Sequence, residues 1–135
     1  MRHLFAIAGV SALFALGGFA EPGSAPPPPK TAHVQVHCPT GNAAGFVTPD
    51  SLHIAVDDSV RWGMTGQVTS DSLIITLKNP RQAWPFTGHA PRGGTSATAA
   101  RALHTGRYGY SVTLECRLPH GGTQRVVIDP DIIIQ

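Results

Sequence analysis

Polar and apolar side chains alternate without a break along residues 107–118. A period of two residues is the repeat of a β-strand, in which successive side chains point to opposite faces of the sheet. One face of this segment would carry Tyr108, Tyr110, Val112, Leu114, Cys116 and Leu118. We therefore expect residues 107–118 to form the longest strand of a sheet that is buried on one side.

Shorter segments repeat this alternation along the chain. They lie at 33–38, 52–56, 60–62, 73–77 and 123–128, and a closing apolar run follows at 132–134. The composition, 15 Gly and 12 Pro with 41% apolar residues, favours short strands and many turns. The sequence predicts one all-β domain at 32–135, a Greek-key β-sandwich of about seven strands. Its expected buried side chains include Val36, Ile54, Trp62, Ile75, Tyr110, Val112, Leu114 and Val127.

Residues 87–106 break the pattern. This segment is rich in Gly, Ala and Thr and has no period of two, so we expect a long loop, with one helical turn at 99–103 as an alternative. Trp84 and Phe86 come just before it, on either side of Pro85. Two interpretations remain open for this aromatic pair, a plug in the core or an exposed recognition surface.

The N-terminus has the pattern of an export signal. A short cationic start at 1–3 precedes an uncharged apolar run, and small residues end it at Gly18 and Ala20. Residues 1–20 are predicted to be a signal peptide, with a retained membrane anchor as the alternative. Residues 21–31 form a Pro-rich tether, which favours the extended polyproline II conformation. The domain is thus expected in the periplasm or outside the cell, within reach of a membrane surface.

Cys38 and Cys116 are the only cysteines of the chain. The alternation places both cysteines on inward faces of strands, and in exported proteins pairs of cysteines are oxidised to disulfides. A disulfide between them is the direct interpretation. Two free thiols, or a copper thiolate at Cys116, are the alternatives.

Two segments carry a family resemblance. Residues 54–62, IAVDDSVRW, resemble the strand, acidic turn and Val-x-Trp strand of cupredoxins, and residues 106–112, GRYGYSV, resemble the strand that leads to the copper cysteine. The closing residues 126–134 are similar to bacterial exported cupredoxin-like domains that have lost the metal. The resemblance implies a cupredoxin-like fold over roughly 33–134.

The copper ligands of that family are only half present. A blue-copper site takes two His, one Cys and usually a weak axial Met. Cys116 and His120 follow nearly the family's order, but no His lies between His53 and His89, and Met64 is the only Met after the signal segment. We expect no metal and no other cofactor, and we expect the histidines to be scattered over the surface. The alternative is a copper-binding electron-transfer cupredoxin that uses Cys116, His120 and His89.

No nucleophile, acid–base or phosphate-loop motif can be identified, so we expect no enzyme. A net charge of +2 with 13% charged residues also argues against nucleic-acid binding.

One charge pattern suggests a partner. No acidic residue lies between Asp71 and Glu115, while Lys78, Arg81, Arg92, Arg101 and Arg107 all do. This is either a solvated basic loop or a positive rim that faces an acidic protein surface or anionic lipid headgroups. The sequence favours a non-enzymatic module that docks on a larger envelope or membrane assembly. The expected partner-binding residues are Trp84, Phe86, Arg92 and Arg101.

Overall fold

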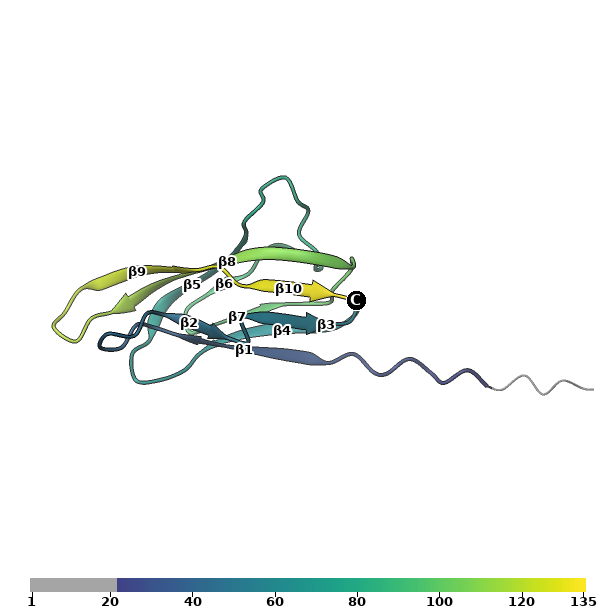
Figure 1. Ribbon diagram of the computed structural model, residues 1–135, viewed down its shortest axis with the longest axis horizontal. Helices are drawn as coiled ribbons and strands as arrows, with labels where there is room; N and C mark the ends of the chain where they lie inside the picture. Colours follow the sequence, from purple (N-terminus) through teal and green to yellow (C-terminus); the bar gives the residue numbers. More distant parts are fainter. Residues whose placement is uncertain (1–21) are drawn as a thin grey trace, which may run out of the picture.

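A computed structural model describes residues 22–135, so the predicted signal peptide or membrane anchor at 1–20 lies outside the described part of the chain. Within residues 22–135, no helix is long and apolar enough to cross a membrane. Ten strands make up the fold (Figure 1): β1 (Thr31–His37), β2 (Phe46–Thr48), β3 (Ser51–Ile54), β4 (Ser59–Met64), β5 (Ser70–Leu77), β6 (Arg92–Gly93), β7 (Ser96–Ala99), β8 (Gly106–Arg117), β9 (Thr123–Ile128) and β10 (Asp131–Ile134).

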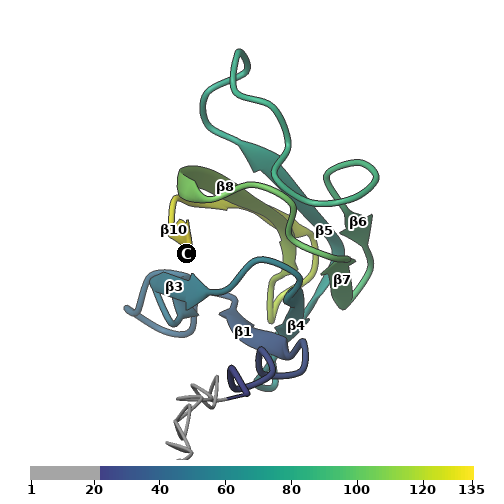
Figure 2. The ribbon, with the colours of Figure 1, turned by 90° about the vertical axis from the view of Figure 1, so that its right-hand side faces the viewer.

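The strands form two mixed sheets that wrap around one core (Figure 2). Sheet 1 has the order β2-β1-β4-β7, in which β1 and β4 are parallel. Sheet 2 has the order β3-β10-β8-β5-β6, and β9 also pairs with β8. The predicted all-β sandwich is confirmed. The three strands beyond the expected seven are β2, β6 and β7, which are short and lack a clear alternating pattern.

The long strand is confirmed as β8, and its inward side chains from Tyr108 to Cys116 are buried. Seven of the eight named core residues are buried as expected: Val36, Ile54, Trp62, Ile75, Tyr110, Val112 and Leu114. The prediction that Val127 is buried is wrong, because this residue is 54% exposed. Val126 pairs with the inward Leu114, so Val127, opposite Thr113, must point outward. Leu118 is also exposed, because β8 ends at Arg117.

The expectation of a long loop at 87–106 is wrong. The segment contains β6, which pairs with β5, and β7, which forms an edge of sheet 1 against β4. Ala97 and Ala99 of β7 point inward and are buried beside Trp62 and Val60, their partners on β4. Residues 99–103 form no helical turn; Ala102 instead makes a β-bridge with Phe86.

The Pro-rich tether runs extended into β1 and leaves the sandwich at the end where the C-terminus lies (Figure 1). The turn between β3 and β4 holds Lys30, the residue before β1. The Lys30 N–H donates to Asp58 Oδ1 at 2.7 Å, and the Ser59 N–H donates to the Lys30 carbonyl at 2.9 Å. Together with the N–H of Ala55, the Lys30 donor holds the pKa of the Asp58 carboxyl below its ordinary value. We call this end of the molecule the tether end.

Candidate functional site

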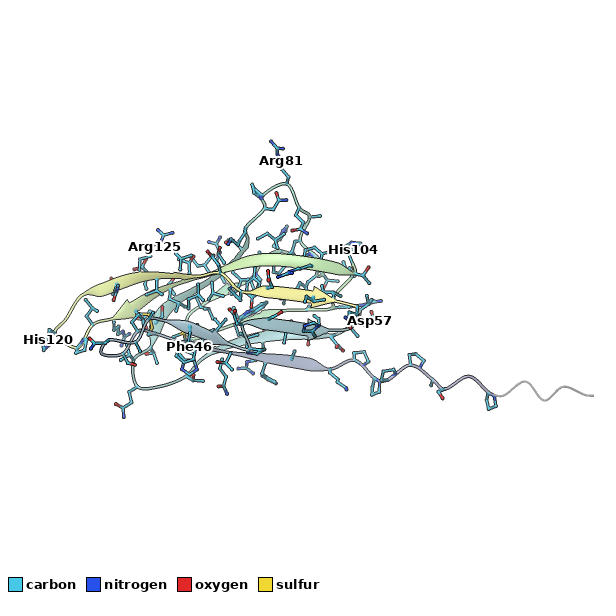
Figure 3. All side chains as sticks on the ribbon, viewed as in Figure 1. Phe46, Asp57, Arg81, His104, His120 and Arg125 are labelled. Carbon is cyan, nitrogen blue, oxygen red and sulfur yellow. A yellow bond between two sulfur atoms is a disulfide. The ribbon has the colours of Figure 1, made fainter. Side chains whose placement is uncertain are left out.

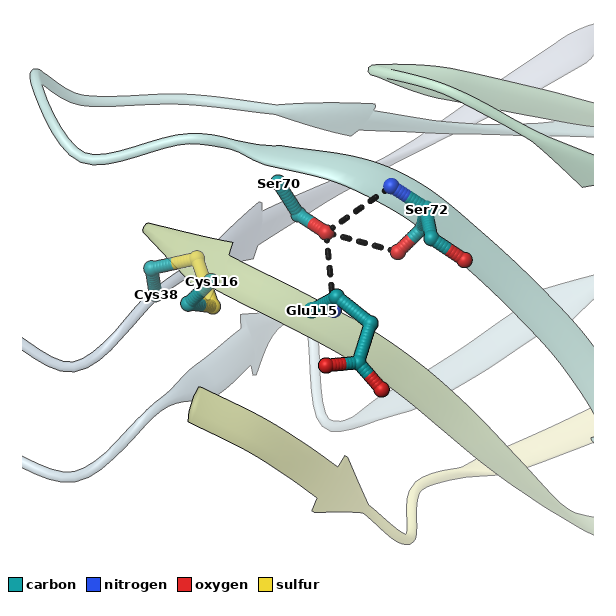
Figure 4. The surroundings of a disulfide bond; sticks show 5 residues. All are labelled: Cys38, Ser70, Ser72, Glu115 and Cys116. Atoms are coloured by element: carbon teal, nitrogen blue, oxygen red, sulfur yellow. Dashed lines mark hydrogen bonds between the residues drawn. A yellow bond between two sulfur atoms is a disulfide. The ribbon is translucent and has the colours of Figure 1, made fainter. Parts of the chain in front are cut away.

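The predicted disulfide is present (Figure 4). Cys38 follows β1 in sheet 1 and Cys116 lies in β8 of sheet 2, with 5.9 Å between their Cα atoms. The bond therefore ties the two sheets together, and neither cysteine is a free thiol. Because the Cys116 sulfur is bonded to Cys38, the alternative copper set loses its thiolate ligand.

Ser70 is a buried hydroxyl beside this disulfide (Figure 4) and was not singled out from the sequence. Its Oγ accepts hydrogen bonds from the N–H groups of Ser72, at 3.1 Å, and Glu115, at 2.9 Å, and it donates to the Ser72 carbonyl at 2.7 Å. The register between β5 and β8 shifts at this point, between Ser70 and Leu73. Ser70 thus satisfies backbone groups that the irregularity would leave without partners, which is a structural role.

The histidines do not converge. His104 lies at the tether end and His120 at the opposite end, in the turn between β8 and β9 (Figure 3). His89 lies in the connection between β5 and β6. Within residues 22–135, no three His, Cys, Asp or Glu side chains are grouped closely enough to hold a metal ion.

Three of the five basic side chains between Asp71 and Glu115 form ion pairs in the folded protein. Lys78 pairs with Asp129, Arg101 with Asp57 and Arg107 with Asp131, so acids from outside the 71–115 interval serve as counter-ions. Arg81 and Arg92 make no ion pair with residues 22–135. The positive rim expected from the sequence is therefore reduced to these two arginines.

The four predicted partner-binding residues do not share one surface. Phe86 is only 2% exposed and belongs to the core, so of its two interpretations the plug is correct. Trp84 packs against it with ring centroids 5.2 Å apart and is half-buried; its indole N–H is buried without an acceptor. Arg101 is held by Asp57 at the tether end, and Arg92 is exposed on β6.

The connection between β5 and β6, residues 78–91, projects from the sandwich (Figures 1 and 2). We call it the projecting loop. Backbone hydrogen bonds fix its base: the Leu103 N–H donates to the Pro85 carbonyl at 2.7 Å, and the Thr87 N–H donates to the Arg101 carbonyl at 2.9 Å.

A turn fixes the tip of the projecting loop. Asn79 Oδ1 accepts from the Arg81 N–H at 3.0 Å, and the Asn79 carbonyl accepts from the Gln82 N–H at 3.1 Å. The Arg81 side chain stands exposed at this tip (Figure 3). Sequence reasoning missed Arg81 as a site residue, although the Asn-Pro-Arg turn is a recognisable signal for an exposed tip.

The strongest shift of a titratable group belongs to the core. The Trp62 indole N–H donates to the Tyr110 hydroxyl at 3.1 Å, and both side chains are buried. Burial raises the pKa of Tyr110 from its ordinary value near 10 to about 12, and the hydrogen bond from Trp62 opposes part of that rise. Tyr110 is therefore a neutral phenol in the folded protein, where its side chain packs in the core.

This shift predicts a loss of stability at high pH. Between pH 10 and 12 the unfolded phenol releases its proton while the folded one keeps it, so stability falls as pH rises through the folded pKa. Two pKa units correspond to roughly 3 kcal/mol. Denaturant unfolding of wild type and Tyr110→Phe at pH 9 and pH 12 measures it: the wild type should lose about 2 kcal/mol more than the variant, because at pH 12 the folded phenol is itself half ionised. Equal losses in the two proteins would show that Tyr110 is not the responsible group.

A scan against protein-family models found no match, and a search of the curated proteins found no match either.

Proposed function

We propose that this protein is a non-enzymatic, exported module of the cupredoxin type that docks on a larger protein assembly of the cell envelope through the projecting loop. The observation that carries the proposal is that residues 78–91 stand out from the sandwich yet are hydrogen-bonded at both base and tip. A protruding loop that is already ordered loses little conformational entropy when a partner binds it.

The charges of the projecting loop and of the strand after it indicate the kind of partner. Arg81 at the tip and Arg92 in β6 are exposed and make no ion pair within residues 22–135. Arginine is enriched among the residues that dominate protein interfaces, and complementary charge steers association. We therefore expect the partner to present an acidic surface to these two side chains.

The cupredoxin type is supported by contacts between the two segments that carry the resemblance. Trp62 from 54–62 and Tyr110 from 106–112 pack edge to face, with ring centroids 5.8 Å apart, and share a hydrogen bond. Export is supported by the disulfide, because such bonds persist in oxidising compartments. The tether, which leaves at the end of the strands, would let the domain reach a partner near a membrane.

Site-specific photo-crosslinking tests the docking surface. A photo-reactive amino acid at Ala83, in the projecting loop, should capture one discrete envelope protein in the native host, whereas the same group at the exposed Ala43 should not. Arg81→Glu combined with Arg92→Glu should lower the captured amount at least tenfold, because two attractive contacts become repulsive.

Arg125→Glu is the matched charge control, since Arg125 is an exposed strand arginine on β9. It should leave capture from position 83 within twofold of wild type. Equal capture from positions 83 and 43, or an unchanged yield in the double variant, would contradict the proposal.

A further inference from the structure

The outer face of sheet 1 carries polar side chains and no carboxylate. Its outward positions alternate with the buried Val34, Val36, Val60 and Trp62. The outward side chains of the four strands are Thr31, His33, Gln35, His37, Phe46, Thr48, Ser59, Arg61, Ser96 and Thr98, with Gly63 among them. Such a face, polar in most positions and free of acids, differs from the outer side of sheet 2, where Asp71, Asp129 and Asp131 pair with basic groups.

A hollow of about 260 Å³ lies on this face, over Gly63. The register places Gln35 and Ser96 on either side of Gly63. Two residues earlier on β4, at the next outward position, it places His33 and Thr98 on either side of Arg61. A Cβ atom built on Gly63 would have no atom within 4 Å. Gly63 therefore forms the floor of the hollow, and its other lining residues are the polar His33, Gln35, Arg61 and Thr65 and the apolar Val34 and Met64.

The hollow is lined by Arg61 and His33 and by no carboxylate from the part of the chain that the structure describes. Arg61 makes no ion pair within residues 22–135, and His33 lies next to it across the parallel pair of β1 and β4. A guanidinium with free donors next to an open hollow suits an anionic group, which it can bind through two parallel hydrogen bonds. The occupant of the hollow should therefore carry a carboxylate or a similar anion.

The neutral groups narrow the choice of occupant. The Gln35 amide and the Thr65 hydroxyl line the hollow beside Arg61 and His33, and both groups can donate and accept hydrogen bonds. Protein interfaces instead centre on aromatic and apolar anchors. The exposed aromatic side chain on this face is Phe46, and it stacks on His37 with ring centroids 4.2 Å apart. The polar lining groups suit a ligand that is rich in hydroxyl groups, and the apolar Val34 and Met64 suit the apolar face of a sugar ring.

We propose that the hollow over Gly63 binds a carboxylated sugar unit of an acidic polysaccharide, with Arg61 and His33 on the carboxylate and Gln35 and Thr65 on ring hydroxyls. The volume is below the 300–1,000 Å³ that is typical for drug-sized ligands, so one sugar unit would be held at a time. The site does not depend on the docking proposal, because sheet 1 and the projecting loop lie on opposite sides of the sandwich (Figures 1 and 2).

Titration calorimetry of the full domain with galacturonate oligomers tests the site, with neutral galactose oligomers of equal length as the ligand control. Wild type should bind the acidic oligomer and show at least tenfold weaker affinity for the neutral one. Gly63→Val should lower the affinity for the acidic oligomer at least tenfold, because its side chain would fill the hollow. Arg61→Gln should do the same by removing the charge.

Arg125→Gln on β9 of sheet 2 is the matched control and should stay within twofold of wild type. Thermal unfolding of each variant checks that it is folded, and amide chemical-shift changes on adding the acidic oligomer should centre on Gln35, Gly63 and Thr65. No binding by wild type, equal binding of the neutral oligomer, or an equal loss in Arg125→Gln would overturn the proposal. The last result would show that the chain attracts polyanions without a site.

Discussion

Replacing Cys38 and Cys116 together by Ala is expected to lower the free energy of unfolding by about 4 kcal/mol. The bond closes a loop between residues that are 78 positions apart, and losing it restores much chain entropy to the unfolded state. Both side chains are buried, so Ala avoids the unpaired hydroxyl that Ser would place in the core. Small domains have total stabilities of roughly 5–15 kcal/mol, so the variant should be close to unfolding at 37 °C.

Urea unfolding followed by circular dichroism measures this loss at 25 °C. Wild type unfolded in urea with a reductant should reproduce the stability of the double variant, because reduction removes the same constraint. Wild type without reductant should keep the higher value. A loss of less than 1 kcal/mol in the double variant would contradict the expectation and show that packing alone holds the two sheets together.

The sequence was sufficient to predict the faces of the strands where apolar and polar residues strictly alternate. In β8, five inward positions from Tyr108 to Cys116 follow this rule, and all are buried. In β9, Val126 and Val127 are adjacent and equally apolar, so the pattern itself cannot decide which one faces inward. Pairing with Leu114 decides it, and that contact depends on the turn between the strands.

Strand β7 shows why propensity alone can fail. Its sequence is Ser-Ala-Thr-Ala, which has neither large apolar side chains nor strong strand formers apart from Thr. The segment is a strand because it pairs with β4 and buries its two Ala side chains in the core. Tertiary packing therefore overrides the local preference for loop.

The charges of the candidate site were the least predictable feature, because folding brings together acidic and basic side chains that lie far apart in the sequence. The acid-free interval from 72 to 114 suggested a positive rim, but Asp57, Asp129 and Asp131 come from distant parts of the sequence and pair with three of its five basic residues. The cysteines were predictable because two cysteines allow only one intramolecular pair. The hollow over Gly63 was not predictable, since the alternation places Gly63 on the outer face but does not show that β1 and β7 lie on either side of it.

Trp62→Ala is the second substitution with a large expected effect. Trp62 is fully buried in sheet 1, and its removal should lower the free energy of unfolding by about 3 to 5 kcal/mol, through lost apolar burial and the cavity left behind. It would also leave the buried Tyr110 hydroxyl without its donor. Denaturant unfolding followed by circular dichroism measures the loss, since the Trp fluorescence signal changes with the substitution.

Trp84→Ala is the matched control, because Trp84 is the other tryptophan and is only half-buried. It should cost clearly less than Trp62→Ala. If Trp62→Ala does not fold, Trp62→Phe keeps most of the apolar volume and separates the hydrogen bond from the packing. Combined with Tyr110→Phe in a double-mutant cycle, it should give a coupling of about 1 kcal/mol, the usual size of a net hydrogen bond. A coupling near zero would mean that the Trp62 and Tyr110 side chains contribute to stability independently. Their contribution would then come from apolar burial in the core and not from the hydrogen bond between them.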